Sequence, residues 1–317
     1  MKKENMKQLI FGIAIAATAI SATVLSFVNL SDSISSSELS SSWMKNIDSN
    51  AYISEISIPG THDSGALYSI GDLSGKCQDV SIKKQLQLGA RFLDIRLKYT
   101  KNKFKIVHGI VDERAVFERE LKSCIDFLDK NPSETIIMSI KKEADGDQGF
   151  NEALEALIKN NSRFYTERTI PQLKDVRGKI VLFSRYSGNT IGLDASHNWV
   201  DPDDDSLTNT FEIVNSDETY HIQDYFKFND VENKWSQIKE CLEFSSSNTN
   251  PKILSINFLS GINNQGFPPS YSVPVAKYIN NEFISYKNSF TKSGIVLFDF
   301  ITEELANIAY TKNLQGA

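Results

Sequence analysis

Two of the four histidines in the chain lie in settings that suit acid–base chemistry. His62 follows an apolar segment and a Pro-Gly turn, and Asp63 comes next to it in the sequence. His108 ends a second apolar segment and is followed by a glycine. Because imidazole titrates near neutral pH, one histidine can accept a proton while the other donates one. These settings favour a catalytic pair over two structural histidines.

An arginine lies between the two histidines in the sequence. Residues 91–96 alternate with a period of two, so Asp94 and Arg96 point to the same face of a predicted strand. A guanidinium held by a carboxylate can donate two hydrogen bonds to a phosphate. Two imidazoles and this cation suffice to transesterify a phosphodiester, since the arginine can stabilise charge on the phosphoryl oxygens. A structural ion pair is the alternative explanation for the Asp94–Arg96 pair.

Other charged groups lie at or just beyond the ends of predicted strands. The predicted strands cover residues 53–58, 91–97, 103–107, 135–140, 179–184, 220–225, 253–258 and 295–298. The groups at their ends are His62, Asp63, Arg96, His108, Lys141, Arg185, Asp224 and Asp299. Since a barrel of parallel strands collects its carboxyl ends at one rim, we expect a polar pocket on the barrel axis.

Amphipathic segments of helical period alternate with these strands. They cover residues 114–129, 151–159, 231–244, 273–286 and 303–310. Strands interleaved with helices predict an α/β protein with a single (β/α)8 TIM-type barrel. Strands 91–97 and 103–107 are too close for a crossover helix, so we expect a distorted, incompletely closed barrel with one antiparallel or poorly closed pair. A doubly wound open sheet is the structural alternative.

The first 28 residues have the pattern of an export signal. Three lysines precede an uncharged apolar run of 20 residues from 9 to 28, which is typical of a signal peptide. About 20 apolar residues also span a bilayer, so an uncleaved membrane anchor through residues 9–28 is the alternative. We predict a secreted, extracellular protein with a Ser-rich linker over 29–45 and one catalytic domain over 46–317.

The composition argues against nucleic acid as a partner, and the cysteines are given no role. Lys plus Arg is 34 and Asp plus Glu is 40, so the net charge is −6. This balance does not attract a polyanion, and we expect no nucleic-acid partner. The three cysteines are widely spaced without a metal-binding pattern, so we assign them no function. We expect a monomer.

Six longer motifs carry a resemblance to a known family. They cover residues 57–65 (SIPGTHDSG), 89–96, 131–143, 177–188, 222–227 and 256–258 and occur in order over about residues 48–302. Together they resemble the bacterial phosphatidylinositol-specific phospholipase C family. The resemblance implies a distorted, incompletely closed barrel and a metal-independent phosphatidylinositol diacylglycerol-lyase. Its products would be diacylglycerol and inositol 1,2-cyclic phosphate, followed by slow hydrolysis of the cyclic phosphate.

The resemblance also implies roles for the acid–base residues. His62 would be the general base that deprotonates the inositol 2-hydroxyl, oriented by Asp299 from the last strand. His108 would be the general acid that releases diacylglycerol, assisted by Asp63. In the slow second stage the two histidines would exchange these roles.

Further roles follow from the same resemblance. Arg96, braced by Asp94, would stabilise the phosphoryl oxygens at the place where eukaryotic relatives bind calcium. The family stacks a tyrosine on the inositol ring, and here the aligned residue is Phe226, beside Tyr225. The remaining inositol hydroxyls would be bound by Lys141, Arg185 and Asp224.

The expected partner is membrane phosphatidylinositol. The rim loop at residues 266–271 is apolar and could insert at an interface, with an ordinary packed loop as the alternative. Whether free phosphatidylinositol or the glycosyl-phosphatidylinositol (GPI) anchor of a protein is the target stays open at this point.

Two other classes of protein remain as alternatives. Metal-dependent phosphodiesterases also use barrels with rim histidines, but they need clustered carboxylates to bind a divalent ion. Around His62 and Arg96 the sequence offers Asp63 and Asp94, and the arginine would repel a metal. A lipid- or glycan-binding module without catalysis is the second alternative, which the presence of both histidines and the arginine weakens.

Overall fold

The computed structural model describes residues 36–68, 75–109, 111–199, 210–263 and 272–314. The chain divides into two units, residues 1–39 and residues 40–317. The predicted signal segment 1–28 and the rim loop 266–271 lie outside the described residues. Within the described ranges, no helix has the length and apolar character needed to cross a membrane.

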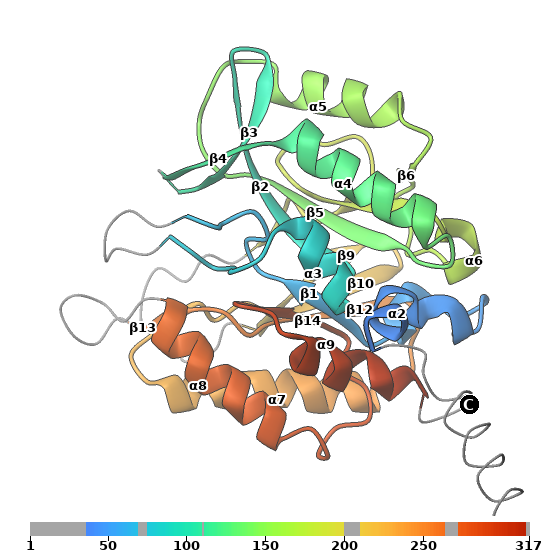
Figure 1. The fold of residues 1–317 in the computed structure, drawn as a ribbon, viewed down its shortest axis with the longest axis vertical. Coiled ribbons are helices and arrows are strands. Elements are labelled where there is room, and N and C mark those ends of the chain that lie inside the picture. The colour runs from blue at the N-terminus through green and yellow to red at the C-terminus, as the bar shows by residue number, and fades with distance from the viewer. Residues whose placement is uncertain (1–35, 69–74, 110, 200–209, 264–271, 315–317) are drawn as a thin grey trace, which may run out of the picture. The chain divides into compact units, whose positions relative to one another are not determined.

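The second unit is built on one large sheet whose strands wrap into an open barrel (Figure 1). In order across the sheet the strands are β6 (Phe164–Tyr165), β7 (Ile180–Arg185), β5 (Ile136–Lys142), β2 (Phe92–Thr100), β1 (Ile58–Thr61), β14 (Ile295–Phe298), β12 (Ile253–Phe258), β10 (Glu218–Gln223) and β9 (Thr210–Asn215). Neighbours are parallel except β9 and β10, which are antiparallel. β6 and β9 form the two ends and do not pair, so the prediction of an incompletely closed barrel is confirmed.

Side chains bridge the gap between the two ends of the sheet. β8 (Leu193–Asp194) pairs with β7 near one end, and Asn215 of β9 donates its amide to the backbone oxygen of Asp194 at 2.8 Å. Glu218, at the start of β10, accepts the backbone N–H of Ile170 at 2.8 and 2.9 Å. These contacts tie the ends together without a continuous ladder of backbone hydrogen bonds.

The antiparallel hairpin expected after β2 is present, but it branches from the barrel. β3 (Lys103–His108) pairs with the outer half of β2, and β4 (Val111–Val116) pairs with β3. Lys101 and Asn102 connect β2 to β3 with φ of 51° and 56°, as two-residue hairpin turns require. The strand at 103–107 and its antiparallel pairing with β2 are as predicted, but it is not one of the barrel strands. The inner half of β2 already pairs with β1 and β5, and β3 pairs with β2 only from Leu97 to Thr100.

Two predicted boundaries also differ from the structure. Residues 53–57 precede the strand, with a 3-10 turn at Ile53–Glu55, and β1 begins at Ile58. Residues 114–116 pair in β4 instead of starting a helix, so α4 covers Phe117–Lys130. Both differences arise because a short segment can form a strand, a turn or part of a helix. Its own sequence does not show which pairing partner it will have.

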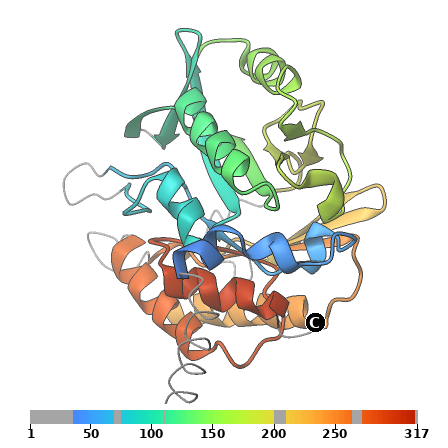
Figure 2. The same cartoon turned by 45° about the vertical axis from the view of Figure 1, so that its right-hand side comes forward.

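Helices cover both sides of the open barrel. The remaining elements are α2 (Ser36–Ser41), η1 (Trp43–Asn46), α3 (Ile82–Leu88), α5 (Phe150–Lys159), α6 (Leu173–Val176), α7 (Val231–Ser247), α8 (Ser272–Ser285), α9 (Glu303–Tyr310) and η3 (Thr311–Leu314), with β11 (Lys227–Phe228) pairing β13 (Ile262–Asn263). In Figure 1 and Figure 2, α7, α8 and α9 (orange to red) lie on one side of the sheet, opposite α4 and α5 (green). The helices predicted at 151–159, 231–244, 273–286 and 303–310 are confirmed to within a few residues.

Side chains alternate along β2 as predicted, so one face of the strand packs in the core and the other faces the site. Leu93, Ile95 and Leu97 belong to an apolar cluster that includes residues of α4 and α5. Asp94 and Arg96 point to the opposite face, inside the barrel. On the neighbouring strand β1, Gly60 allows the close approach, since a Cβ there would lie 2.7 Å from the Cβ of Phe92.

A buried ion pair stabilises the end of the barrel at which the strands begin. Residues 40–45, expected in the linker, belong to the folded unit, and Trp43 and Met44 are buried. Arg91 and Glu134 pair at 2.9 Å with both side chains fully buried, and Glu134 also accepts the backbone N–H of Met44 at 3.1 Å. The Trp43 ring stacks on Tyr310 with 5.5 Å between the ring centroids. One carboxylate thus fastens this segment to the sheet.

Replacing Glu134 with alanine leaves a buried guanidinium without its counter-charge. We expect Glu134→Ala to lower the free energy of unfolding by about 3–5 kcal/mol, measured by urea denaturation. Glu152→Ala, on an exposed position of α5, is the matched control and should change it little. A loss for Glu134→Ala no larger than for the control would contradict the assigned role of the pair.

Candidate active site

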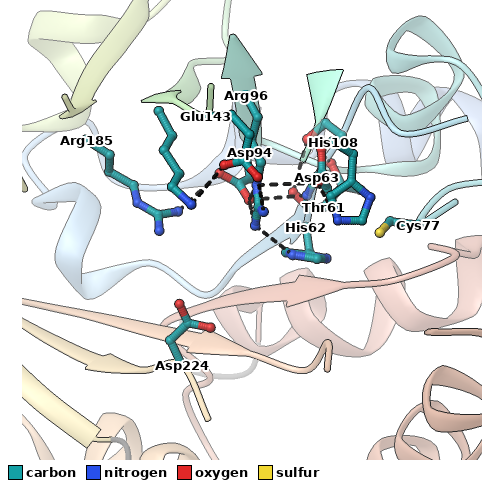
Figure 3. Close-up of polar contacts among 12 residues, drawn as sticks. Thr61, His62, Asp63, Cys77, Asp94, Arg96, His108, Glu143, Arg185 and Asp224 are labelled. Atoms are coloured by element: carbon teal, nitrogen blue, oxygen red, sulfur yellow. Dashed lines mark hydrogen bonds and ion pairs between the residues drawn. The ribbon is translucent and has the colours of Figure 1, made fainter. Parts of the chain in front are cut away.

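A pocket of about 600 Å³ opens at the carboxyl ends of the barrel strands. Eight of the ten predicted site residues line it, namely His62, Arg96, His108, Lys141, Arg185, Asp224, Phe226 and Asp299. The other two, Asp63 and Asp94, are fully buried behind this wall and contact Arg96. Strands from distant parts of the chain therefore bring all ten residues to one site. Figure 3 labels His62, Asp63, Asp94, Arg96, His108, Arg185 and Asp224.

His62 lies in the turn directly after β1 and is oriented by a carboxylate. Its Nδ1 lies 2.8 Å from Oδ1 of Asp299, which follows β14, the strand paired with β1. Arg96 donates from Nη2 to Nε2 of His62 at 2.8 Å. Because a guanidinium only donates, Nε2 is the unprotonated nitrogen and Nδ1–H donates to Asp299. This tautomer presents a basic nitrogen to the pocket.

The environment of His62 favours its protonated form. Burial by itself lowers the pKa of His62, but the Asp299 carboxylate more than offsets burial and raises it above the usual value. Gln78 fixes the backbone here, since its amide donates to the carbonyl oxygens of His62 at 2.9 Å and Phe298 at 2.8 Å. His62 is therefore held in place from both its ring and its main chain.

Carboxylates surround the guanidinium of Arg96. Asp94 accepts from its Nε and Nη2 at 3.2 and 3.1 Å, Asp63 lies 3.4 Å from Nε, and Glu143 lies 3.5 Å from Nη1. Burial opposes the charge, but the carboxylates of Asp63 and Asp94 outweigh burial and raise the pKa of Arg96. The side chain is only 12% exposed, so its cation acts in a largely dry site.

Asp94 holds a second cation at the same time. Its Oδ1 lies 3.2 Å from Nη1 of Arg185, at the end of β7. Burial alone would raise the pKa of Asp94, and the guanidiniums of Arg96 and Arg185 hold it well below its usual range. Asp94 is therefore ionised at neutral pH and fixes both arginines toward the pocket.

His108 reaches the pocket from the end of β3. Its Nδ1 lies 2.5 Å from the carbonyl oxygen of Gly75, and its Nε2 lies 3.5 Å from Oδ2 of Asp63. A carbonyl only accepts, so Nδ1 carries a proton, and Nε2 is the nitrogen that faces the Asp63 carboxylate. Burial raises the pKa of Asp63 although Arg96 and His108 oppose this change. The pair therefore suits proton donation.

The remaining predicted residues form the opposite wall. The Arg185 guanidinium lies over the ring of Trp199 at 3.5 Å, and Trp199 donates its Nε1–H to Asp224 at 3.1 Å. Phe226 lines the pocket, whereas Tyr225 is buried in the core. Phe226 is thus the aromatic residue that faces the pocket.

Sequence reasoning missed nine of the residues that line the pocket, among them Glu143, Cys77 and Trp199. Glu143 lies 2.8 Å from Nζ of Lys141, and the period of two from Lys141 could have identified it. Cys77 and Trp199 lie in loops without periodicity, and no sequence signal marks them. The structure brings them to the site through contacts between distant segments.

The other histidines lie in the settings expected of structural residues. His221 stacks on Phe244 at 3.7 Å, and His197 lies 3.8 Å from Asp194. The three cysteines are buried and unpaired with one another, and only Cys77 is among the described residues lining the pocket.

Comparison with known proteins agrees with this arrangement. Residues 56–186 match the family model of the phosphatidylinositol-specific phospholipase C X domain. Over 291 residues the chain is 31% identical to a 1-phosphatidylinositol phosphodiesterase of Staphylococcus aureus strain Newman, covering 85% of this chain and 90% of that protein. The chain belongs to the phosphatidylinositol-specific phospholipase C family. The resemblance and the enzyme class predicted from the motifs are therefore confirmed.

Solved structures of this family share the fold. A structure of the S. aureus phosphatidylinositol-specific phospholipase C has a TM-score of 0.77 at 28% identity, covering 86% of this chain and 97% of that one. The phosphatidylinositol-specific phospholipase C of Listeria monocytogenes has a TM-score of 0.69 at 25% identity, covering 86% and 98%. The open barrel is thus the fold of these bacterial phospholipases.

Asp299→Asn removes the charge that raises the pKa of His62. We expect the pKa of His62, followed by NMR of its imidazole, to fall, because burial is then less opposed. A base must be neutral to accept a proton, so the acid limb of kcat/KM moves to lower pH while the maximum rate drops. Asp126→Asn, exposed on α4, is the control. An unchanged or higher pKa in Asp299→Asn would contradict this account.

Proposed function

We propose that this protein cleaves phosphatidylinositol to diacylglycerol and inositol 1,2-cyclic phosphate by acid–base catalysis without a metal ion. The observation that carries the proposal is that His62, Arg96 and His108 line one pocket, where Arg96 contacts His62 directly and Asp63 contacts both Arg96 and His108. Each histidine has its Nδ1 engaged, by Asp299 and by the carbonyl of Gly75. Each therefore turns Nε2 toward the reacting groups.

In the first stage His62 is the general base. Its Nε2 accepts the proton of the inositol 2-hydroxyl, and the resulting oxygen attacks phosphorus. Asp299 stabilises the imidazolium that forms, since it already accepts the Nδ1–H at 2.8 Å. Substrate must take the place of the Arg96–His62 contact, so the phosphoryl oxygen receives the guanidinium that now donates to Nε2.

His108 completes the same stage as general acid. The bond from phosphorus to the glycerol oxygen breaks, and Nε2 of His108 transfers its proton to that oxygen. Asp63, 3.5 Å from Nε2, supports the protonated imidazole beforehand. Asp63 also lies 3.4 Å from Nε of Arg96, so one carboxylate couples the acid to the cation that stabilises phosphoryl charge.

The second stage reverses these roles. Neutral His108 accepts a proton from water, which attacks the cyclic phosphate, and protonated His62 returns its proton to the inositol 2-oxygen. Both histidines then have their starting protonation states. Microscopic reversibility makes this the natural route for the slow hydrolysis.

The opposite wall binds the inositol. We assign its hydroxyls to Lys141, Arg185 and Asp224 and its ring face to Phe226. The contacts of Trp199 with Arg185 and Asp224 orient these two side chains, so Trp199 adds to the same binding surface. Rigid, oppositely charged groups at fixed spacing suit a polyhydroxyl ring.

Export and membrane contact belong to the same proposal. We infer secretion, with 1–28 as the signal peptide, a linker from 29 and the catalytic domain as the folded part, and with retention through 9–28 as the alternative. The rim loop 266–271 is the proposed membrane contact. GPI anchors share the inositol phosphodiester with phosphatidylinositol and are a second substrate class, and the enzyme acts as a monomer.

Phosphorus NMR of phosphatidylinositol vesicles in excess EDTA tests the reaction class. We expect the full-length protein to produce a cyclic phosphodiester signal. His62→Ala should slow its appearance by about 100- to 10,000-fold, the usual contribution of a general base. His221→Ala, which removes a histidine stacked on Phe244, is the control and should keep the rate.

Other outcomes identify the alternatives. Turnover that is lost in EDTA and restored by magnesium or calcium would assign the protein to the metal-dependent phosphodiesterases. Vesicle binding without turnover in either condition would make it a binding module.

A substrate with a different leaving group distinguishes the proposed general acid from the proposed general base. With an inositol phosphodiester of nitrophenol, the leaving oxygen is stable as an anion and needs little protonation. We expect His108→Ala to recover most of its lost rate on this substrate, measured by nitrophenolate absorbance, while His62→Ala stays slow. Equal recovery of the two variants would contradict the assigned roles.

A further inference from the structure

A thiol lies beside the acid–base groups. Cys77 is buried in the pocket wall with 2% of its surface exposed, close to both histidines (Figure 3). It belongs to two groups of ligand atoms, His62–Cys77–Asp299 and Asp63–Cys77–His108, and within each group the atoms lie within 4.8 Å of one another. The proposed reaction uses both histidines and both carboxylates but has no step for the thiol.

His108 has the orientation that metal-binding histidines adopt. Such a histidine usually donates one ring N–H to a backbone carbonyl or carboxylate and turns the other nitrogen to the metal. Here Nδ1 donates to the Gly75 oxygen at 2.5 Å, and the Cys77 thiol donates to the same oxygen at 3.8 Å. A Cβ at residue 75 would lie 3.1 Å from this Nδ1, so glycine permits the close approach. One carbonyl therefore aligns the nitrogen and sulfur ligands.

Asp63 supplies an oxygen ligand beside them. Its side chain is fully buried, and among the described residues neither of its oxygens accepts a hydrogen bond. Its contacts are the ion pairs to Nε of Arg96 at 3.4 Å and to Nε2 of His108 at 3.5 Å. A buried carboxylate with unused lone pairs can accept a cation at little cost in other contacts.

The chemistry of these three donors selects the metal. Sulfur, imidazole nitrogen and carboxylate oxygen together suit a borderline-soft ion such as Zn²⁺, whereas Mg²⁺ and Ca²⁺ prefer oxygen alone. Arg96 opposes a cation here, but Asp94 and Glu143 contact the other nitrogens of its guanidinium. The carboxylate of Asp63 is thus the nearest anion for a metal on the Cys77 side.

We propose that Cys77, His108 and Asp63 form an inhibitory site for thiophilic divalent cations of the zinc class. Binding releases the thiol proton to solvent, and Nε2 of His108 coordinates the ion instead of carrying a proton. The inhibitory part rests on the proposed function, because it requires His108 to be the general acid. The binding part does not, and it is measured separately.

Cobalt provides a direct reading of the thiolate ligand. We expect the full-length protein titrated with Co²⁺ to bind one equivalent in the pocket with a near-ultraviolet thiolate-to-cobalt absorption band, which Zn²⁺ displaces. Cys77→Ser should lose this band and bind Zn²⁺ at least about tenfold more weakly. Cys124→Ala, which removes a buried thiol on α4, is the matched control and should keep the band. Circular dichroism checks that each variant is folded.

Zinc inhibition tests the functional consequence. Vesicle assays with increasing Zn²⁺ should show inhibition that excess EDTA reverses. For Cys77→Ser, compared with its own zinc-free rate, the same inhibition should need at least about tenfold more Zn²⁺. A cobalt band that persists in Cys77→Ser, or equal zinc sensitivity of that variant and the unmodified protein, would overturn the proposal.

The two proposals fail in different ways. Thiolate binding of cobalt without turnover in EDTA would contradict the proposed reaction but support the metal site. Turnover in EDTA without a thiolate band, in a folded protein, would remove the metal site and leave the reaction.

Discussion

The buried carboxylate of Asp94 determines the geometry of the site. One of its oxygens accepts from Arg96 and from the backbone N–H of Asp63, and the other lies 3.2 Å from Arg185. Its backbone oxygen also accepts the N–H of Ser64 at 2.8 Å. A single anion therefore fixes two cations and the turn that carries both His62 and Asp63. Without it, two guanidiniums would repel each other at largely buried positions, and burial makes that arrangement costly.

Much of this site can be predicted from the sequence, because parallel strands bring their carboxyl ends to the same rim. Once 91–97, 135–140 and 179–184 are predicted as strands of one barrel, Arg96, Lys141 and Arg185 must share one rim, and the observed register pairs Arg96 with Lys141 and Lys141 with Arg185. The sequence neighbours of His108 identify it, yet it reaches the rim from a hairpin outside the barrel. The residues beside a histidine in the sequence are thus a better guide to its place in the site than the element predicted to carry it.

What the sequence does not predict depends on contacts between distant segments. Trp199 acquires its position from Arg185 and Asp224, and no local pattern marks such a contact. The end of the barrel at which the strands begin depends on the pairing of Arg91 with Glu134 across 43 positions, which fastens residues 40–46 to the sheet. Periodicity identifies the face on which a residue lies, but a partner far along the chain becomes known only when the fold brings the two together.

Acid–base catalysis and metal binding place the same demand on a histidine. Each requires one ring nitrogen to be engaged so that the other faces the pocket, and Asp299 and the Gly75 carbonyl meet this demand for His62 and His108. What separates the two chemistries is the group between them. In the proposed reaction Arg96 supplies the positive charge that a metal would otherwise bring to a phosphate, and its own charge disfavours a metal beside His62. In the proposed inhibitory site the ion lies with Asp63 and Cys77, a soft ligand that no step of the proposed reaction uses. The proposed reaction needs no metal, and the proposed inhibitory ion would block it by binding its general acid.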